Sequence, residues 1–270
     1  MLYVLTLCIS VMNAPLTEGQ IAYVAGTEQE DRCVMLLDLS GGEPVRLGMG
    51  LRDASPRWSP DGAWLAFEYV TETGVHLALV RADGSERKDL TTDQPWNRFI
   101  AWSPDGKRIA YVASDTNPQE STIRVLNIES GVEEIWGGGR TGIVRPVWLG
   151  EKSPLVAALV DKLNEEEGPE AEAWKQVKPD PANTLLAIGL SLGAEKRGLS
   201  TEIFVVTRDH ALPLPSFIMP SRGSYVEWAA EPHPKGNKVA FESNDGGDRE
   251  IFVLTHRGAV NISNHRAADW

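Results

Sequence analysis

The stretch that decides the fold occurs twice. Residues 57–67 read RWSPDGAWLAF, and about 44 positions later residues 101–111 read AWSPDGKRIAY. In each copy a Pro-Asp-Gly turn separates two short runs of β-forming residues. Proline fixes φ where the turn begins and glycine accepts a positive φ, so this arrangement is typical of a β-hairpin. The two copies therefore predict hairpins built from one repeated unit.

Weaker copies of the unit extend over most of the chain. They occupy residues 16–23, 146–157, 178–188 and 233–241. A second alternating run follows at residues 34–39, 76–81, 122–128, 202–207 and 250–255. Each of these runs is followed by a pair of turn residues: Ser40-Gly41, Asp83-Gly84, Ser130-Gly131, Asp209-His210 and Arg257-Gly258. Two linked hairpins in a unit predict a four-stranded antiparallel sheet.

A four-stranded sheet of this size cannot bury both of its faces alone, and radial stacking of such sheets solves that problem. The sequence therefore predicts an all-β chain that forms a β-propeller of four-stranded antiparallel blades. Six copies favour six blades. Five remain an alternative, because the fourth copy is interrupted by the polar residues 161–170 and only about 30 residues separate it from the fifth.

The repeat resembles the WD-like propeller repeat of the TolB family. The resemblance rests on the Trp-Ser-Pro-Asp-Gly motif, on the Ile-Ala-Phe/Tyr run that follows it, and on EIFVL at residues 250–254. It spans about residues 17–263. The resemblance implies a non-enzymatic binding protein of the bacterial envelope that acts outside the cytoplasm. It concerns the propeller, because the domain that TolB carries ahead of its propeller is not recognised here.

Residues 15–270 are expected to form a single propeller domain, and residues 1–14 allow two interpretations. Residues 2–11 are largely apolar, which is typical of a signal peptide, but no Lys or Arg precedes them. Residues 2–6 also resemble residues 252–255, so they could supply the outer strand of an incomplete blade. The first alternative predicts a periplasmic or secreted protein, and the second allows a cytoplasmic one.

Composition excludes several classes of function. The chain has 26 Lys and Arg against 38 Asp and Glu, a formal charge of −12, which argues against nucleic-acid binding. Its two cysteines, Cys8 and Cys33, lack the spacing of a zinc site or a disulfide framework. No apolar run reaches the roughly 18 residues that span a membrane. We expect a monomer without a cofactor or a metal.

Three motifs look chemical but fit the repeat better. Ser191 lies in GLSLG, the pattern of a hydrolase nucleophile elbow, yet a polar loop follows where the elbow needs a helix. Residues 137–142 match GxGxxG literally, but a predicted strand follows in place of a helix. Asp245 and Asp248 belong to an incomplete calcium-loop pattern. We therefore predict no catalytic residue.

Some recurrent residues are expected to be structural. Trp58, Trp102 and Trp148 recur at the repeat period, so we expect them to anchor neighbouring blades. The turn pairs Asp61-Gly62 and Asp105-Gly106 are expected to close hairpins, because an Asp carboxylate accepts hydrogen bonds from nearby backbone N–H groups.

A binding face is predicted on the loops between blades. These loops carry one arginine each in five cases, with a tryptophan beside the second: Arg52, Arg98, Arg140, Arg222 and Arg266, with Trp96. Acidic blade turns are expected to surround them. Guanidinium groups pair with carboxylates through two parallel hydrogen bonds, so the face predicts a protein or peptide partner rich in carboxylates. The alternative is five unrelated, solvated arginines.

Two other functional classes remain open. Similar repeats precede the catalytic domain of prolyl-oligopeptidase-like serine peptidases, so the chain could be the gating propeller of a longer protein that continues past Trp270. A propeller enzyme with a metal or sugar site in its channel would need several His or carboxylate side chains at equivalent repeat positions. The aligned repeats show no such set.

Overall fold

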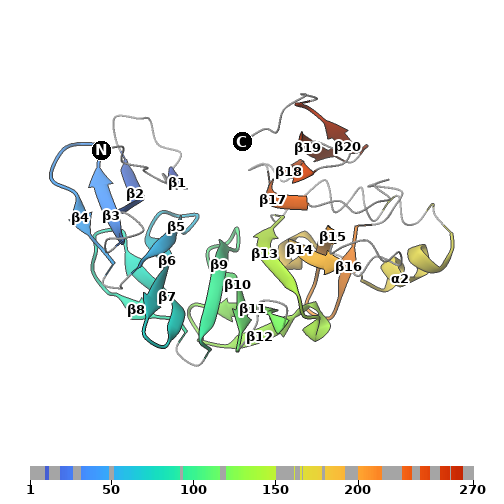
Figure 1. Cartoon of the computed structure of the whole chain (residues 1–270), viewed down its shortest axis with the longest axis horizontal. Coiled ribbons are helices and arrows are strands. Elements are labelled where there is room, and N and C mark those ends of the chain that lie inside the picture. Colours follow the sequence, from blue (N-terminus) through green and yellow to red (C-terminus); the bar gives the residue numbers. More distant parts are fainter. Residues whose placement is uncertain are drawn as a thin grey trace. The chain divides into compact units, whose positions relative to one another are not determined.

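The structure is a computed structural model. It describes residues 10–11, 19–26, 32–48, 52–91, 94–115, 120–149, 161, 165, 167–177, 180–191, 200–214, 227–232, 238–243, 250–255 and 257–263. The chain divides into two compact units, Met1–Asn117 and Pro118–Trp270, and the elements of each are labelled in Figure 1.

The first unit is built from strands whose pairings are mostly antiparallel. Its first sheet has the order β1 (Ser10–Val11), β2 (Gln20–Ala25), β3 (Cys33–Asp38) and β4 (Val45–Arg46). The second sheet has the order β5 (Ala54–Trp58), β6 (Trp64–Thr71), β7 (Gly74–Arg81) and β8 (Lys88–Asp89). The same sheet continues from β7 to the hairpin of β9 (Trp96–Trp102) and β10 (Arg108–Ser114), because Val75 of β7 pairs with Trp96 of β9.

The second unit contains a hairpin followed by two four-stranded sheets. It begins with the hairpin of β11 (Thr122–Asn127) and β12 (Glu133–Trp136). One sheet contains β13 (Ile143–Trp148), β14 (Leu185–Ser191), β15 (Ser200–Val206) and β16 (Ala211–Pro213). The next contains β17 (Glu227–Pro232), β18 (Val239–Ser243), β19 (Glu250–Thr255) and β20 (Gly258–Asn261). Short helices η2 (Gly137–Gly139), α2 (Pro169–Val177) and η3 (Pro181–Asn183) lie between strands. None of the helices in the described residues is long and apolar enough to cross a bilayer.

The repeated turns close by a short hydrogen-bond chain. Oδ1 of Asp61 accepts bonds from Ser59 Oγ (2.6 Å) and from the N–H of Ala63 (3.0 Å). Ser59 Oγ in turn accepts a bond from the N–H of Trp64 (2.9 Å), the first residue of β6. The Ser59 hydroxyl and the Ala63 N–H lower the pKa of Asp61, because both bonds favour the charged carboxylate.

The turn between β9 and β10 is built in the same way. Oδ1 of Asp105 accepts bonds from Ser103 Oγ (2.5 Å) and the N–H of Lys107 (3.1 Å). Ser103 Oγ accepts a bond from the N–H of Arg108 (2.9 Å), which begins β10. Burial is the largest single effect and raises the pKa of Asp105, but the bonds from Ser103 and Lys107 and the charges of Arg108 and Lys107 together outweigh it, so the pKa is lowered. The two quoted motifs therefore give the same local structure.

A β-bulge recurs in the first strand of successive units of the repeat. The pairing register shifts in β5, β9 and β13, and at each shift a residue other than glycine has a positive φ. These residues are Ser55 (53°), Phe99 (62°) and Arg145 (55°), which occupy the same repeat position. A bulge leaves one residue outside the ladder and redirects its side chain. Each strand therefore presents one side chain that the regular pleat would place differently.

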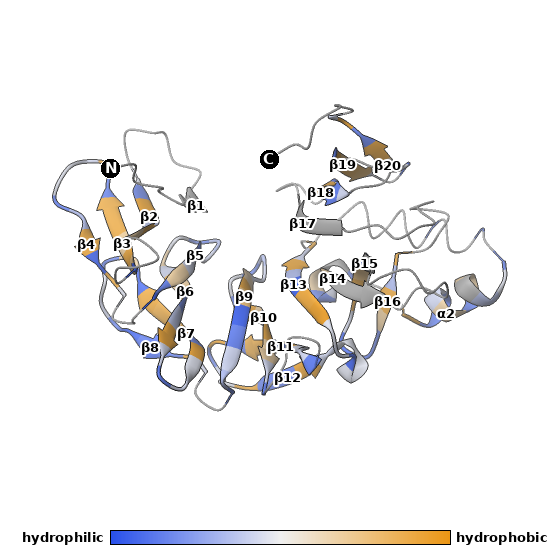
Figure 2. Ribbon diagram, in the orientation of Figure 1, coloured by the Kyte–Doolittle hydropathy of each residue, from blue (hydrophilic) through white to orange (hydrophobic). Residues whose placement is uncertain are grey.

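The hydrophobic core of the first unit lies between consecutive sheets. Val34, Leu36 and Leu47 of the first sheet pack against Leu65 and Phe67 of the second, in a cluster that also contains Trp58. Hydrophobic residues dominate β3, whereas hydrophilic residues interrupt β9 (Figure 2). The strand with the bulge at Phe99 therefore departs from the apolar pattern of the core strands.

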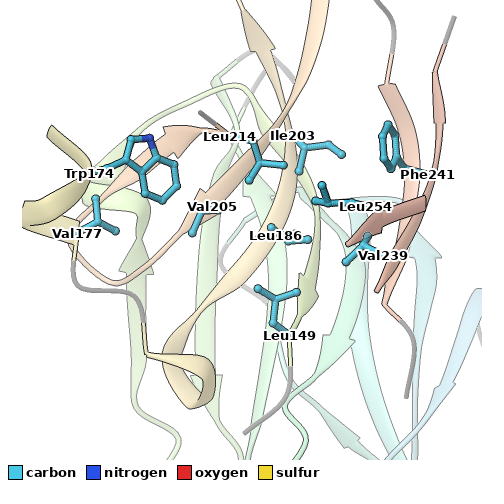
Figure 3. Close-up of a cluster of buried hydrophobic side chains, with 10 residues drawn as sticks. All are labelled: Leu149, Trp174, Val177, Leu186, Ile203, Val205, Leu214, Val239, Phe241 and Leu254. Atoms are coloured by element: carbon cyan, nitrogen blue, oxygen red, sulfur yellow. The ribbon is translucent and has the colours of Figure 1, made fainter. Parts of the chain in front are cut away.

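The core of the second unit includes a helix that the repeat does not predict. Trp174 and Val177 of α2 join Ile203 of β15 and residues of β18 and β19, among them Phe241 and Leu254 (Figure 3). Trp174 is fully buried. The polar segment that begins at residue 161 therefore leads into an element that packs on the sheet.

One detail of the repeat differs from the sequence expectation. The fifth copy, around residues 185–188, was expected to begin its own blade. Instead Leu185–Ser191 pairs with Ile143–Trp148, so the fourth and fifth copies supply neighbouring strands of one sheet. The insertion that carries α2 separates two strands that would otherwise form a short hairpin, and spacing along the chain does not distinguish this case from a new blade. The number of blades stays a prediction.

The motifs that looked chemical lie in ordinary β structure. Ser191 ends β14, which is antiparallel to both neighbouring strands and not part of the parallel sheet that a nucleophile elbow requires. Gly137–Gly139 form a single 3-10 turn that leads into β13. Ser10–Val11 pair with β2, whereas residues 2–6, Asp245 and Asp248 lie outside the described residues.

Candidate binding site on strand β9

Trp96 and Arg98 lie on β9 and not in the preceding loop where the sequence placed them. The strand begins early because the N–H of Val75 donates to the carbonyl of Pro95 (2.9 Å) and Val75 pairs with Trp96 in parallel. A loop connection thereby becomes part of the sheet. This correction places the tryptophan and the arginine two residues apart, on one face of one strand.

The start of β9 is fixed by close contact with β7. A Cβ added at Gly74, whose φ is 144°, would lie 1.8 Å from the carbonyl oxygen of Pro95. The amide Nδ2 of Asn97 donates to the carbonyls of Val75 (3.1 Å) and Gln94 (2.7 Å), and Asn97 is fully buried. The glycine allows the approach and the asparagine satisfies the backbone there.

A buried carboxylate holds the middle of the strand. Glu68 projects from β6, and its side chain is 2% exposed. Its Oε2 accepts a hydrogen bond from Arg98 Nε (3.1 Å), and its Oε1 accepts one from the N–H of Phe99 (2.9 Å). A buried carboxylate requires such partners, because leaving it unpaired away from water is costly. Glu68 therefore fixes both the guanidinium and the backbone of the bulge.

Two aromatic rings flank the guanidinium. The Cζ atom of Arg98 lies 6.0 Å from the ring centroid of Trp96 and 5.4 Å from that of Phe99. The two rings meet edge to face, with centroids 6.1 Å apart. Arg98 is 40% exposed, and both rings are half-buried. We call Glu68, Trp96, Arg98 and Phe99 the β9 cluster.

The β9 cluster presents a held but accessible cation. Glu68 engages Nε of Arg98, and among the described residues the two Nη groups make no hydrogen bond. An Nη edge can donate to a carboxylate, and rings on either side add apolar and cation–π contacts. In the part of the chain that the structure describes, no group of three His, Cys, Asp or Glu side chains could hold a metal ion.

The other predicted arginines have separate surroundings. Arg52 is exposed and forms an isolated parallel bridge with Arg32 just before β5. Arg140 belongs to the second unit, where its guanidinium lies 4.4 Å from the ring centroid of Phe204. Two more predicted arginines, Arg222 and Arg266, lie outside the described residues. The structure thus brings together Trp96 and Arg98, and the wider arginine face stays a prediction.

The repeated tryptophans make different contacts. Trp58 is buried in the core between the first two sheets. Trp102 is half-buried, and its Nε1 donates to the carbonyl of Arg57 (3.0 Å), which links β9 to β5. Trp148 is buried and meets Trp136 edge to face at 5.5 Å. Gly62 and Gly106, next to the turn aspartates, have φ values of 70° and 69°.

Sequence reasoning missed Glu68 and Phe99. A signal for Glu68 was present, because it is an acidic residue inside the apolar run LAFEYV, where the equivalent repeat positions hold Val24 and Val112. Phe99 gave no signal, since an aromatic residue in a strand is ordinary. Only the positive φ and the contact with Glu68 distinguish it.

The chain was compared with protein families, with curated proteins and with solved structures. No family profile matches the chain. An uncharacterized protein of Agrobacterium fabrum is 29% identical over 141 residues, which are 48% of this chain and 48% of that protein. The chain thus spans about half the length of the curated relative it matches.

Three of the similar solved structures illustrate the fold. The proposed TolB of Agrobacterium tumefaciens has a TM-score of 0.58 and 20% identity, covering 89% of this chain and 76% of that one. TolB of Acinetobacter baumannii has a TM-score of 0.60 and 16% identity, covering 92% and 53%. The β-propeller domain of the Trilobed protease of Pyrococcus furiosus has a TM-score of 0.61 and 10% identity, covering 96% and 72%. The chain has the β-propeller fold of these proteins, which confirms the predicted fold class and, for the fold, the resemblance to TolB.

Proposed function

We propose that the chain is a non-enzymatic, TolB-like binding scaffold that captures a protein or peptide segment carrying carboxylates. It acts outside the cytoplasm of a bacterium, as the resemblance to TolB implies, and we expect it to be a monomer. The observation that carries the proposal is the β9 cluster, in which a buried Glu68 holds the half-exposed Arg98 between two aromatic rings.

The physical argument starts from preorganisation. A free arginine side chain loses conformational entropy when it binds a ligand, and a guanidinium already held by a carboxylate and two rings loses less. Arginine and aromatic residues also dominate the binding energy of protein interfaces. The neighbouring strands of the sheet hold β9 in place, so β9 can present the site without rearrangement.

A binding titration tests the proposal. A fluorescent peptide with several Glu residues and the same peptide with Gln in their place are titrated with the protein, and anisotropy is measured at low and moderate salt. We expect the acidic peptide to bind more tightly, and Arg98→Ala to weaken it by roughly tenfold, as loss of a charged hydrogen bond predicts.

The matched control is Arg57→Ala, an exposed arginine on β5 of the same unit, which keeps the backbone carbonyl that accepts the hydrogen bond from Trp102. Arg140→Ala in the second unit is measured separately. Equal binding of the acidic and amide peptides, or equal loss in the Arg98 and Arg57 variants, would contradict the proposal.

A second candidate function is the propeller of a serine peptidase. It is favoured by the similarity to the propeller domain of the Trilobed protease, which shows the fold alone at 10% identity. The coding sequence around the chain tests it. Continuation past Trp270 into about 250 residues of α/β-hydrolase pattern would favour the peptidase, and a stop codon there would favour the binding scaffold.

A further inference from the structure

We infer that Glu68 and Phe99 set the specificity of the β9 cluster, so that it takes a single carboxylate next to a flat apolar or aromatic group and rejects a phosphate. This inference rests on the proposed binding function and deepens it. Glu68 selects the ligand by its charge, and Phe99 selects it by its shape. A separate observation supports each of these two effects.

The charge step follows from the ion pair. Arg98 and Glu68 are in direct contact, so the pair is close to neutral before a ligand arrives. A carboxylate brings one negative charge, and the outer Nη edge of the guanidinium can donate hydrogen bonds to it. A phosphate monoester brings nearly two charges at neutral pH and is usually bound by clusters of arginines. The buried Glu68 would repel the second charge across a poorly screened distance.

The shape step follows from the bulge. Phe99 has a φ of 62°, which is costly for an aromatic residue, and the Glu68 bond to its N–H holds it there. In this conformation its ring lies against Arg98 and edge to face with Trp96. A carboxylate on Arg98 would therefore place its neighbouring group against these rings, where a planar apolar group gains the most contact.

The other bulges show that the backbone alone does not create this site. Ser55 and Arg145 have the same positive φ at the same repeat position. The residues before them, Ala54 and Val144, offer no guanidinium. Among the bulges at Ser55, Phe99 and Arg145, the carboxylate, the guanidinium and the ring occur together at Phe99.

Four labelled peptides of one scaffold test the inference by anisotropy. They carry Glu-Trp, Gln-Trp, phosphoserine-Trp or Glu-Ala at the centre. For the unaltered protein we expect Glu-Trp to bind at least tenfold more tightly than Gln-Trp, and severalfold more tightly than phosphoserine-Trp and Glu-Ala. Phe99→Leu, which keeps an apolar side chain, should remove the difference between Glu-Trp and Glu-Ala. Glu68→Gln should bring phosphoserine-Trp up to the affinity of Glu-Trp.

The outcomes separate the two proposals. If Glu-Trp binds no better than Gln-Trp, the proposed carboxylate-binding function fails. The specificity inference is wrong if Glu-Trp binds more tightly than Gln-Trp but phosphoserine-Trp binds as tightly as Glu-Trp. It is also wrong if the Phe99→Leu variant still binds Glu-Trp more tightly than Glu-Ala. In both cases the proposed binding function stands. Should Glu68→Gln fail to fold, the four peptides on the unaltered protein and on Phe99→Leu still decide, with Arg57→Ala as the control.

Discussion

Strands β5 and β9 are two copies of one structure with different consequences. Both begin a hairpin closed by the same aspartate turn, and both carry a bulge with a positive φ, at Ser55 and Phe99. They differ at the residue before the bulge and in the facing strand, where Glu68 stands at the repeat position of Val24. The repeat therefore fixes the backbone, and side chains that break the repeat create the candidate site.

The largest expected effect comes from the contact that places β9 against β7. Gly74→Ala should lower the free energy of unfolding by about 3 kcal/mol or prevent folding, because the new Cβ would overlap the Pro95 carbonyl. Chemical denaturation measures the change. Gly41→Ala is the control, since Gly41 also has a positive φ (123°) but open space around it, and should cost about 1 kcal/mol. Equal losses in the two variants would show that the close approach does not matter.

The next effect concerns the residue that distinguishes the two strands. Glu68→Ala should destabilise the protein by about 2 kcal/mol, because Arg98 and the N–H of Phe99 lose their hydrogen-bond acceptor. Arg98 keeps partial access to water, which limits the loss. Val24→Ala, at the equivalent position facing β5, should cost about 1 kcal/mol through lost packing. Urea denaturation of the pair checks the difference. A smaller loss for Glu68 than for Val24 would argue that the ion pair contributes no stability.

A smaller effect should be the same in both copies. Asp61→Ala and Asp105→Ala each remove the acceptor of two hydrogen bonds in a turn, and we expect each to cost about 1 kcal/mol. The double variant should lose about the sum, because Asp61 and Asp105 each bond only to residues of their own turn, although the two turns lie close together at Pro60 and Gly106. Thermal unfolding of the three variants tests this. Clearly different losses of stability in the Asp61→Ala and Asp105→Ala variants would mean that the two copies are not structurally equivalent.

The smallest effect is a dependence on pH. The folded protein lowers the pKa of Asp61 and Asp105, so their contribution to stability is complete above the ordinary value of about 4 and is lost as the pH falls through the lowered values. Both carboxylates are largely exposed, which keeps the effect small. Asp61→Asn combined with Asp105→Asn should flatten the decline of stability at acid pH in denaturation series. An unchanged decline would assign it to other carboxylates.

Local chemistry explains what the sequence could predict. The hairpin turns were predictable because Asp61 bonds to groups two residues away, and the strand runs because their alternation is local. The pairing of Leu185 with Trp148 was not, since the insertion breaks the spacing on which the repeat depends. The partnership of Glu68 with Arg98 was also hidden, because residues 30 positions apart meet only after β9 pairs with β7 and forms its bulge.

The helix inserted between β13 and β14 has a practical consequence for engineering. Strands β5 and β6 are joined by a tight turn at residues 59–63. Strands β13 and β14 occupy the same place in their repeat and still pair, although the segment that joins them contains α2. A chain excursion at this junction is thus compatible with the sheet. We therefore expect the turn at residues 59–63 to accept an inserted domain, such as a fluorescent one, without loss of the sheet.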